Sequence, residues 1–301
     1  MENIIRYLKD NDVKYNENVD LSKITSYKVG GKARLIIYPS SEKELVSVLK
    51  IIDYYRLDFK IIGNCTNLLF SDELYKDVLI NLSKMNEIKF LSNNKVKVGP
   101  GVNLIKLSLM TAKKGLTGLE FASGIPGNIG GAIYMNAGAY KSDMGYIVKS
   151  VRVLTDRYEI ITLVNKEMNF HYRSSFLQNH KDYICLGAIL QLKKGKKEAI
   201  EEVIKSRRER RVESQPLEYP SCGSVFRNPE GDFAGRLIEE AGLKGKTIGG
   251  AKVSEKHANF IINYNNATSK DIHDLILLVH DTVLKKYKID LKCEQEFVNW
   301  E

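Results

Sequence analysis

The sequence GLTGLEFASGIPGNIGGAIYMNAGAY, residues 115–140, is the most unusual stretch of the chain. It holds seven of the 22 glycines, and such a cluster predicts a backbone that turns tightly or lets a ligand approach closely. Apolar residues such as Phe121, Ile125 and Ile129 lie between the glycines, which is not typical of a flexible linker. We therefore expect a loop with a fixed conformation.

Two interpretations of this loop are open from composition. Its spacing, Gly124-x-x-Gly127-x-x-Gly130-Gly131, differs from the G-x-G-x-x-G of a Rossmann turn and from a Walker A loop. A fixed loop with accessible backbone amides suits an anion such as a phosphate. The alternative is a packing corner between two subdomains, where glycine only lets two segments lie close together.

The composition is that of an ordinary globular protein. The chain has 301 residues, 43% of them hydrophobic and 28% charged, which fits two domains or one large one. No apolar run reaches the roughly 18 residues needed to span a bilayer. Residues 1–15 interrupt their apolar residues with charges, unlike a signal peptide. These features predict a cytoplasmic location without membrane insertion.

The net charge favours acidic partners. It is formally +9, which suits nucleic acid or phosphorylated small molecules. Part of the positive charge lies in KKGKKEAIEEVIKSRRERR, residues 193–211, whose mixed signs are typical of an exposed helix. No aromatic residues alternate with its basic ones, as a surface for single-stranded nucleic acid needs. We therefore expect a solvated helix there.

Cysteine and histidine give no sign of a metal. The cysteines Cys65, Cys185, Cys222 and Cys293 lie far apart with no C-x-x-C pair, so neither a zinc site nor a disulfide framework is expected. Small, buried packing residues are their expected role. No HExxH, G-x-S-x-G or metal-ligand cluster occurs, which argues against metallohydrolase and serine-hydrolase chemistry.

The first part of the chain predicts a β-α-β unit followed by a polar loop. We expect a strand at residues 33–39, then a helix that begins after Ser41 with Glu44 completing a capping box. A second strand, FKIIG, occupies residues 59–63. The loop GNCTNLLF, residues 63–70, follows directly, and ligands of open α/β folds bind at such strand ends.

Strands and helices are also predicted further along. Residues 148–194 contain three alternating, strand-like patterns. Asp232 is expected to cap a short helix that ends at Gly242. Thr268 and Asp271 form a second predicted capping box ahead of a long amphipathic helix, and the tail is expected to be extended.

Three isolated features suit chemistry. Arg173 in YRSS can stabilise negative charge that develops on a carboxylate or enolate, and Ser224 in CGSVFRNP can pass a proton. A carboxylate of the tail can hold or relay one. Each residue by itself is more often structural than catalytic. Composition and spacing alone thus predict a cytoplasmic α/β protein that binds phosphorylated ligands.

Seven motifs cover nearly the whole chain: SYKVGGKA (26–33), GNCTNLL (63–69), GLEFASGIPGNIGGAIYMNAGAY (118–140), YRSSF (172–176), CGSVFRNP (222–229), AGRLIEEAGLKG (234–245) and GGAKVSEKHANFIIN (249–263). In these motifs and their order the chain resembles the UDP-N-acetylenolpyruvoylglucosamine reductase (MurB) family. Its length, with little sequence between YRSSF and the charged helix, resembles the shorter subclass of that family.

The resemblance implies an α+β fold with an FAD-binding domain of the vanillyl-alcohol oxidase (PCMH) type. That domain would span residues 1–194, with lobes of roughly 1–80 and 81–194. Residues 195–301 would form an α+β substrate-binding domain whose tail returns to the active site. The implied protein is a monomer that binds a UDP-sugar and NADPH, and neither nucleic acid nor membrane.

The implied activity is that of an FAD-containing, NADPH-dependent oxidoreductase. It would reduce UDP-N-acetylglucosamine enolpyruvate to UDP-N-acetylmuramate in peptidoglycan precursor synthesis, and so serve cell wall biogenesis, cell shape and cell division. NADPH would reduce FAD, and flavin N5 would then give a hydride to the methylene carbon of the enolpyruvyl group. Ser224 would give a proton to the α-carbon.

The family's motifs imply roles for single residues of this chain. Arg173 would bind the enolpyruvyl carboxylate, Ser224 would donate the proton and Glu294 would support the same intermediate, with Glu296 as the alternative. The residues implied for FAD are Tyr27, Gly63, Asn64, Cys65, Thr66, Asn67, Gly124, Ile125, Pro126, Gly127, Gly130, Gly131 and Ala132. Those implied for the substrate are Tyr172, Arg227, Asn228, His257 and Asn259.

Three departures from the family pattern stand out. Cys65 and Thr66 replace the usual Gly-Ser pair of the pyrophosphate loop, although Thr66 keeps a hydroxyl. Arg227 replaces a common lysine, which preserves charge but changes geometry. The tail lacks a closing glycine, which leaves the glutamate register open. The alternative functions are another FAD-dependent oxidoreductase of the same fold and a basic nucleic-acid-binding or regulatory protein.

Overall fold

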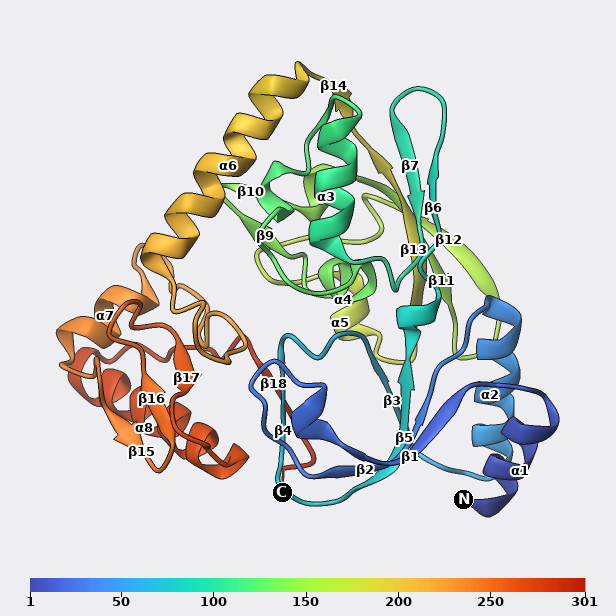
Figure 1. Cartoon of the computed structure of the whole chain (residues 1–301), viewed down its shortest axis with the longest axis horizontal. Coiled ribbons are helices and arrows are strands. Elements are labelled where there is room, and N and C mark those ends of the chain that lie inside the picture. The colour runs from blue at the N-terminus through green and yellow to red at the C-terminus, as the bar shows by residue number, and fades with distance from the viewer. Residues whose placement is uncertain (301) are drawn as a thin grey trace. The chain divides into compact units, whose positions relative to one another are not determined.

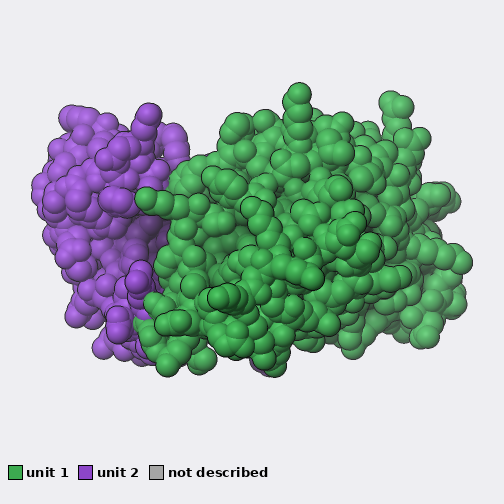
Figure 2. Space-filling model, turned by 90° about the horizontal axis from the view of Figure 1, so that it is seen from above, with its two compact units in different colours: residues 1–16, 35–63, 77–209 green, residues 17–34, 64–76, 210–301 purple. Residues whose placement is uncertain are grey.

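The protein is described here from a computed structural model that covers residues 1–300 (Figure 1). The chain folds into two compact units, which are coloured separately in Figure 2. Each unit is assembled from three segments of the chain. Unit 1 comprises Met1–Asn16, Leu35–Gly63 and Asp77–Glu209, and unit 2 comprises Glu17–Arg34, Asn64–Lys76 and the chain from Arg210 onward.

The first core of unit 1 contains the predicted β-α-β unit. A four-stranded sheet has the order β1-β2-β5-β3, and β3 runs parallel to β5. Most of β1 and the start of β2 lie in the segment Glu17–Arg34, which is counted with unit 2. Leu35 and Val78 of the sheet are fully buried in one cluster with Leu45 of the helix that follows β2. The elements are α1 (Glu2–Asp10), β1 (Tyr15–Asp20), β2 (Lys32–Ile37), α2 (Glu42–Tyr54), β3 (Phe59–Ile62), β5 (Tyr75–Asn81) and the 3-10 turn η2 (Leu82–Lys84).

The helix α2 begins where the sequence predicts it. Ser41 is its N-cap, and Ser41 Oγ accepts a hydrogen bond from the Glu44 amide at 3.2 Å. The return bond is displaced by one residue from the predicted capping box, because the Glu44 carboxylate accepts from the amide of Ser40 at 2.8 Å. The helix start is therefore confirmed, while the reciprocal contact was predicted one residue too late.

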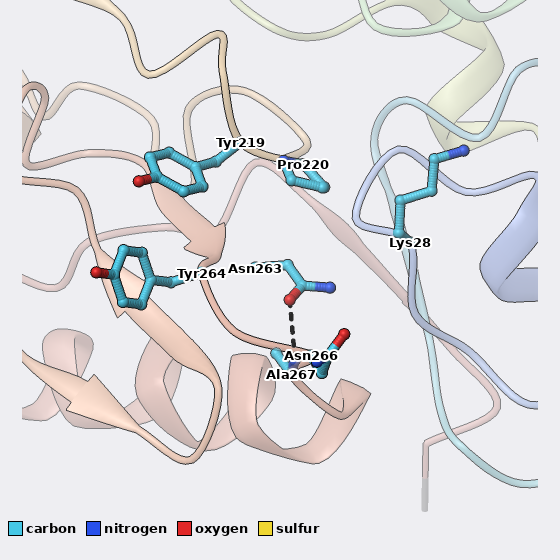
Figure 3. A pocket seen from close by; sticks show the side chains of 7 residues that line it. All are labelled: Lys28, Tyr219, Pro220, Asn263, Tyr264, Asn266 and Ala267. Carbon is cyan, nitrogen blue, oxygen red and sulfur yellow. Dashed lines mark hydrogen bonds between the residues drawn. The ribbon is translucent and has the colours of Figure 1, made fainter.

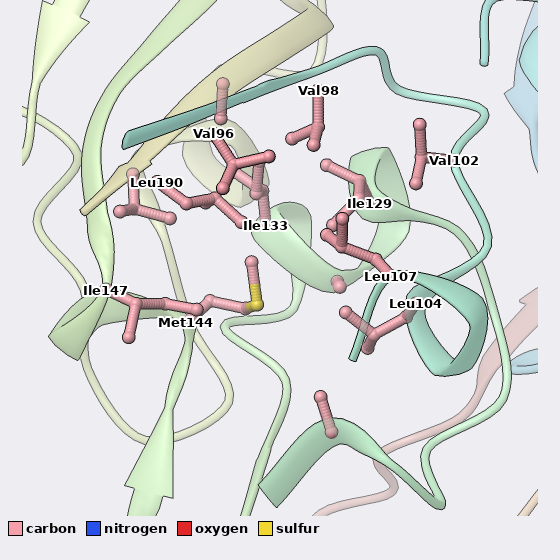
Figure 4. Close-up of a cluster of buried hydrophobic side chains, with 14 of the residues drawn as sticks. Val96, Val98, Val102, Leu104, Leu107, Ile129, Ile133, Met144, Ile147 and Leu190 are labelled. Atoms are coloured by element: carbon pink, nitrogen blue, oxygen red, sulfur yellow. The ribbon is translucent and has the colours of Figure 1, made fainter. Parts of the chain in front are cut away.

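The second core of unit 1 lies between a five-stranded antiparallel sheet and two helices (Figure 4). The sheet has the order β12-β11-β13-β7-β6. Alternate residues of its strands, such as Val96 and Val98, are buried against Leu107 of α3 and Ile133 of α4, as the period of two predicts. The elements are β6 (Ile88–Phe90), β7 (Lys95–Val98), α3 (Leu104–Lys113), α4 (Ile129–Tyr134), β11 (Val148–Leu154), β12 (Ile160–Val164) and β13 (Ile184–Gln191).

Short elements connect this core, and a polar helix follows it. The helix α6 (Lys197–Ser214) confirms the predicted charged helix, and Ile200 is its one buried residue. Such a polar helix gains little from burial and depends on its ends and on surface pairs. The short elements are β8 (Leu116–Thr117), η3 (Glu120–Ala122), β9 (Gly138–Ala139), β10 (Ser142–Asp143), η4 (Met144–Tyr146), α5 (Phe176–Asn179) and β14 (Lys193–Lys194).

Unit 2 packs a long helix, α8, against a three-stranded sheet of order β15-β16-β17. A second, two-stranded sheet forms where the chain's tail pairs in parallel with a strand far from it in sequence, with Glu296 opposite Leu68. The elements are η1 (Leu21–Lys23), β4 (Leu68–Phe70), α7 (Ala234–Glu240), β15 (Thr247–Ile248), β16 (Ala251–Val253), β17 (Ile261–Asn263), α8 (Ser269–Tyr287) and β18 (Glu296–Val298).

The helix caps of unit 2 confirm one prediction and correct another. Thr268 and Asp271 form the reciprocal capping box expected at the start of α8. Asp232 does not cap α7, whose N-cap position is Phe233. Asp232 instead accepts from the Phe233 amide and pairs with Arg236 one turn into the helix. The predicted cap is wrong because the Asp232 carboxylate binds the Arg236 guanidinium instead of the amides of the first helical turn.

Within residues 1–300, no helix is both long and apolar enough to cross a membrane. The same residues contain no group of three or more side chains that could together hold a metal ion. All four cysteines are free thiols. The functional division predicted at residue 195 stays a prediction, since compactness does not test ligand binding. By compactness, residues 17–34 and 64–76 belong with the chain after Arg210.

Candidate active site

The structure brings together two of the segments predicted to bind FAD, both in unit 1. Gly63, at the end of β3, lies against Asn128, which precedes α4. A methyl group on Gly63 would lie 2.6 Å from Asn128 Oδ1, closer than any real contact. Asn128 is held in turn by its amide group, which donates to the Gly101 carbonyl at 2.8 Å. Gly63 is therefore a glycine because the neighbouring loop leaves no room for a side chain.

The glycine-rich run itself combines packing with open backbone. The amides of Ile129 and Gly130 donate to the carbonyls of Val102 and Pro100 at 2.9 and 2.8 Å, so the fold already uses them. Gly130 also packs 3.2 Å from Pro100, measured from where its Cβ would be. A side chain at Gly131, by contrast, would meet nothing within 4 Å. The run is thus a packing corner at Gly130 and an open surface at Gly131.

The rest of the predicted pyrophosphate loop, residues 64–67, belongs to unit 2. Cys65 adopts a left-handed backbone with φ of 51°, a conformation that favours glycine. Asn67 joins the loop to the tail in two bonds. Its side-chain amide donates to the Glu294 carbonyl at 3.0 Å, and its carbonyl accepts from the Glu296 amide at 3.0 Å.

Tyr27 is a core residue of unit 2. Its side chain is fully buried, and its hydroxyl donates to Gln295 Oε1 at 2.9 Å. Its carbonyl accepts from the Asn263 side chain at 3.0 Å. Burial strongly raises the pKa of the Tyr27 phenol, so this hydroxyl stays protonated. These contacts favour a packing role, and the predicted contact of Tyr27 with FAD stays a prediction.

Ser224 and Glu294 lie on neighbouring extended segments of unit 2. Ser224 pairs with Phe260 in an antiparallel bridge on one side. On the other side, the Glu294 amide donates to the Val225 carbonyl at 2.7 Å. Gly223, just before Ser224, has a φ of 76°, and a side chain there would meet nothing within 4 Å. The segment that carries the predicted proton donor thus has open space beside it.

Asn259 fixes this segment through its side chain. Its Oδ1 accepts from the Phe226 amide at 3.0 Å, and its Nδ2 donates to the Phe226 carbonyl at 2.8 Å. The side chain is 4% exposed. Both polar atoms of Asn259 are therefore engaged by the backbone two residues after Ser224. This geometry favours positioning of the Ser224 segment over direct contact with a substrate.

His257 lies beside Asn259 and Phe260. Its Nδ1 accepts from the Asn259 amide at 3.2 Å, which leaves the proton of the neutral ring on Nε2. Burial lowers the pKa of His257, so the ring is neutral at pH 7. A neutral ring can donate one hydrogen bond from Nε2 but supplies no charge.

Arg227 and Asn228 follow on the same segment. The Arg227 amide donates to the Lys292 carbonyl at 2.9 Å. Arg227 Nε is buried and has no hydrogen-bond partner among residues 1–300, which is unusual for a cationic donor and fits an anion bound there. Asn228 Oδ1 accepts from the Ala234 amide at 3.1 Å and so satisfies the start of α7.

Arg173 stands in unit 1, at the third position of a tight turn. His171 and Ser174 close the turn through two backbone hydrogen bonds of 3.0 and 3.1 Å. Arg173 has a φ of 54°, which costs a side-chain-bearing residue of order 1 kcal/mol or more. Its guanidinium donates to the Gly138 carbonyl at 3.1 Å and lies 5.2 Å from the centre of the Tyr172 ring. A strained backbone fits a functional site, but 15 other non-glycine residues of the described chain also have a positive φ.

The cysteines near these segments are largely buried. Cys65 and Cys222 are 4% and 6% exposed. Burial raises the pKa of Cys293 to about 11 and that of Cys222 further. The thiols of Cys222 and Cys293 therefore stay protonated at neutral pH, which agrees with packing as the expected role of the cysteines.

A separate pocket in unit 2 contains none of the predicted site residues (Figure 3). Its volume is about 460 Å³. The rings of Tyr219 and Tyr264 pack on each other at one side, 5.4 Å apart. Asn263 bonds to the Ala267 amide at 2.8 Å, so its oxygen is already engaged. The pocket is lined by Lys28, Tyr219, Pro220, Asn263, Tyr264, Asn266 and Ala267.

Sequence reasoning missed several residues that hold the site. Asn128 lies inside the glycine-rich run, and Gln295 lies between the two candidate glutamates. Asn136 and Gln178 bind the backbone around Arg173. For Asn128 and Asn136, an asparagine amid small or apolar residues was the available signal, because a buried amide must find partners. The signal did not indicate which backbone groups those partners would be.

Comparison with known proteins identifies the family. Residues 33–163 match the model of an FAD binding domain, and residues 215–298 match the C-terminal domain of UDP-N-acetylenolpyruvoylglucosamine reductase. The reductase of Bacillus velezensis is 43% identical over 299 residues, 99% of both chains. The chain belongs to the UDP-N-acetylenolpyruvoylglucosamine reductase family.

Other members of the UDP-N-acetylenolpyruvoylglucosamine reductase family are similar to this chain over nearly its whole length. The reductase of Caldanaerobacter subterraneus is 43% identical over 97% of this chain and 95% of its own. The crystal structure of the Thermus caldophilus reductase matches with a TM-score of 0.80 and 31% identity, over 95% of this chain and 98% of that one. The predicted fold class, an FAD-binding domain of the vanillyl-alcohol oxidase type with an α+β C-terminal domain, is confirmed, as is a flavin-dependent oxidoreductase.

Proposed function

We propose that this protein reduces UDP-N-acetylglucosamine enolpyruvate to UDP-N-acetylmuramate, with FAD as cofactor and NADPH as reductant, in peptidoglycan precursor synthesis. Full-length similarity to reductases of that name supports the substrate. The observation that carries the chemistry is the 2.7 Å bond between the Glu294 amide and the Val225 carbonyl. That bond holds the predicted proton donor, Ser224, and a carboxylate on adjacent segments of one unit.

The described residues fit FAD. A side chain at Gly63 would clash with Asn128 Oδ1, and Gly131 leaves backbone open where a Cβ would lie, as close approach of a phosphate requires. We propose that Gly63–Asn67 and Gly124–Ala132 hold the cofactor. When bound, FAD supplies the hydride for the enolpyruvyl double bond after accepting one from NADPH.

Arg173 is proposed to bind the carboxylate of the enolpyruvyl group. A guanidinium offers two parallel donors to a carboxylate, and its fixed charge stabilises the negative charge that develops beside it. The turn presents the side chain half-exposed, next to the exposed ring of Tyr172. Its bond to the Gly138 carbonyl has a neutral acceptor, which a charged carboxylate can replace.

Ser224 is proposed to donate a proton to the α-carbon. A hydroxyl is a weak acid, but it serves towards a carbanion-like centre when its position is fixed. The paired segments and Asn259 supply that fixed position. Glu294 is proposed to support the same centre. Gln295 is buried, so Glu294 and Glu296 both point to its opposite side, and Glu296 stays the alternative.

The substrate's remaining groups are proposed to contact Arg227, Asn228 and His257. The buried Nε of Arg227, which has no partner among residues 1–300, suits a diphosphate oxygen. The neutral ring of His257 can donate from Nε2. The C-terminal domain is accordingly proposed as the substrate-binding one, and the protein is proposed to act as a cytoplasmic monomer.

The proposed activity is tested by direct conversion of the substrate. Purified protein, FAD and NADPH are mixed with UDP-N-acetylglucosamine enolpyruvate, and UDP-N-acetylmuramate is sought by mass spectrometry with NADPH oxidation followed at the same time. Product formation that needs all three components supports the proposal. Oxidation of NADPH by oxygen without muramate product would favour another flavin oxidoreductase. A colourless protein that takes up no FAD would contradict both.

A further inference from the structure

The turn that carries Arg173 is too small to maintain its own conformation. It is a two-residue connection closed by one pair of backbone bonds between His171 and Ser174. Short isolated hairpins are marginal in water, and the left-handed backbone of Arg173, φ 54°, adds a cost. Residues outside the turn must therefore stabilise it.

Two side-chain amides from unit 1 bind the carbonyls of this turn. Asn136 Nδ2 donates to the His171 carbonyl at 2.8 Å. Gln178 Nε2 donates to the Arg173 carbonyl at 3.0 Å and to the Tyr134 carbonyl at 3.0 Å. The first and third residues of the turn are thus each tied to chain outside it.

Asn136 is itself firmly held. It is 1% exposed, and its own backbone is left-handed with φ of 43°, which asparagine tolerates better than most residues. Its Oδ1 accepts from the Gly145 amide at 2.9 Å. A buried asparagine that uses both ends of its amide on backbone groups of two other segments fixes their relative position. Here one of those segments contains Arg173.

We propose that Asn136 and Gln178 are positioning residues that hold the His171–Ser174 turn so that the Arg173 guanidinium meets the substrate's carboxylate. This inference rests on the proposed function for the role of Arg173. Neither amide is proposed to touch the substrate. They act by keeping Arg173 in a conformation that its own backbone disfavours.

The cleanest variant is Asn136→Asp. It keeps the shape, the tolerance of a left-handed backbone and the acceptor for the Gly145 amide, and it replaces the donor to the His171 carbonyl with a carboxylate oxygen that repels that carbonyl. Gln178→Glu is the equivalent change at the other amide. Asn165→Asp is the control for loss of an amide donor, because Asn165 is exposed and its Nδ2 donates to the carbonyls of Gly145 and Val148 at 2.8 and 2.7 Å but not to the turn.

Affinity measurements with two ligands distinguish a positioning role of Asn136 and Gln178 from a general loss of structure. We expect Asn136→Asp and Gln178→Glu to weaken binding of UDP-N-acetylglucosamine enolpyruvate about 10–100-fold, since small displacements of a charged contact have effects of this size. Binding of UDP-N-acetylglucosamine, which lacks the carboxylate, should not change. The rate at which NADPH bleaches bound FAD should also stay within about twofold. Asn165→Asp should resemble the wild type in all three measurements.

A double-mutant comparison with Arg173→Ala tests whether the two amides act through Arg173. In an Arg173→Ala background, Asn136→Asp and Gln178→Glu should cause no further loss of affinity or turnover, because residues that act through one group are not additive. Additive losses, or equal losses for both ligands, would overturn the inference while leaving the proposed function intact. Wild-type protein that does not bind the enolpyruvyl substrate would overturn the proposed function itself. If one variant fails to fold, the other carries the same test.

Discussion

The Arg173 turn and the Ser224 segment are held in place by opposite means. The turn is fixed by two side-chain amides: Gln178 binds the carbonyl five residues before it, and Asn136 binds the His171 carbonyl 35 residues after it. The Ser224 segment is fixed by strand-like pairing with distant chain. Asn67, which bonds to the Glu294 carbonyl, is separated from it by 227 residues. Arg173 thus lies in a turn with a strained backbone, whereas Ser224 lies in a segment held by backbone pairing with distant parts of the chain.

This difference indicates at which of the two places a substitution can change activity without lowering stability. A strained turn can relax without disturbing a core, because its cost is local. A segment that several distant strands share cannot be altered without affecting them all. Substitutions at the two places should therefore separate activity from stability in different ways.

The largest expected effect is that of Ser224→Ala. Loss of the proton donor should slow reoxidation of the reduced enzyme by the enolpyruvyl substrate about 10²–10⁴-fold. Bleaching of the flavin by NADPH should be nearly unchanged, because that step does not need the proton. Stopped-flow absorbance of the flavin band measures both. If both half-reactions slowed together, Ser224 would not be the donor.

Arg173→Gly should separate activity from stability most clearly. Glycine adopts the φ of 54° without strain, so the free energy of unfolding should stay within about 1 kcal/mol of the wild type. Turnover should fall about 10²–10³-fold, since a charge-stabilising group is lost. Urea unfolding and steady-state kinetics test this. A large loss of FAD binding would instead place Arg173 at the cofactor.

Asn259→Ala should do the reverse and destabilise unit 2. It leaves the buried amide and carbonyl of Phe226 without their side-chain partner, at a cost of about 2–4 kcal/mol. Urea unfolding measures the change. Activity should fall as well, through disorder of the Ser224 segment. An active variant with wild-type stability would show that the paired backbone alone holds Ser224, which would weaken the comparison.

Two glycines test the packing and cradle interpretations of the cofactor loops. Gly63→Ala should lower stability by about 1–3 kcal/mol, because its methyl group meets Asn128. Gly131→Ala meets no protein atom and should raise stability by up to about 1 kcal/mol. If FAD approaches Gly131, the same variant should bind FAD more weakly. Flavin fluorescence titration measures affinity, and unchanged affinity would argue for packing alone.

The smallest effects concern pH. Burial lowers the pKa of His257 in the folded state, so its stabilising contribution is present above the unfolded pKa of about 6.5 and is lost as pH falls. Hydrogen bonds from the protonated ring to the carboxylates of Asp290 and Asp281 raise the pKa of His280. Its contribution is present below pH 6.5 and is lost as pH rises through the folded pKa.

Urea midpoints between pH 5 and 8 distinguish the two histidines. His257→Gln should reduce the loss of stability in acid, while His280→Gln should lower stability mainly at acidic pH. His280 lies outside the proposed site and serves as the control of opposite sign. Identical pH profiles for the two variants would contradict both assignments.

Much of the fold could be predicted from local sequence. The start of α2 at Ser41, the capping box of Thr268 and Asp271 and the charged helix α6 all follow from patterns within one or two turns. Asp232 shows the limit, because one carboxylate had two local partners and the sequence does not rank them. The residues proposed for chemistry came from family motifs, and composition alone gave no more than a phosphate-binding α/β protein.

The sequence by itself determined the element types, the family and the residues worth testing, because helix caps, strand alternation and motifs are short-range signals. Only the tertiary structure decided that Gly130 packs while Gly131 stays open. It also decided that Asn259 clamps Phe226 and that Asn136 and Gln178 bind the Arg173 turn. The physical reason is that a buried amide or a glycine is explained by its partners. Those partners are brought near by folding from positions that the local sequence does not specify.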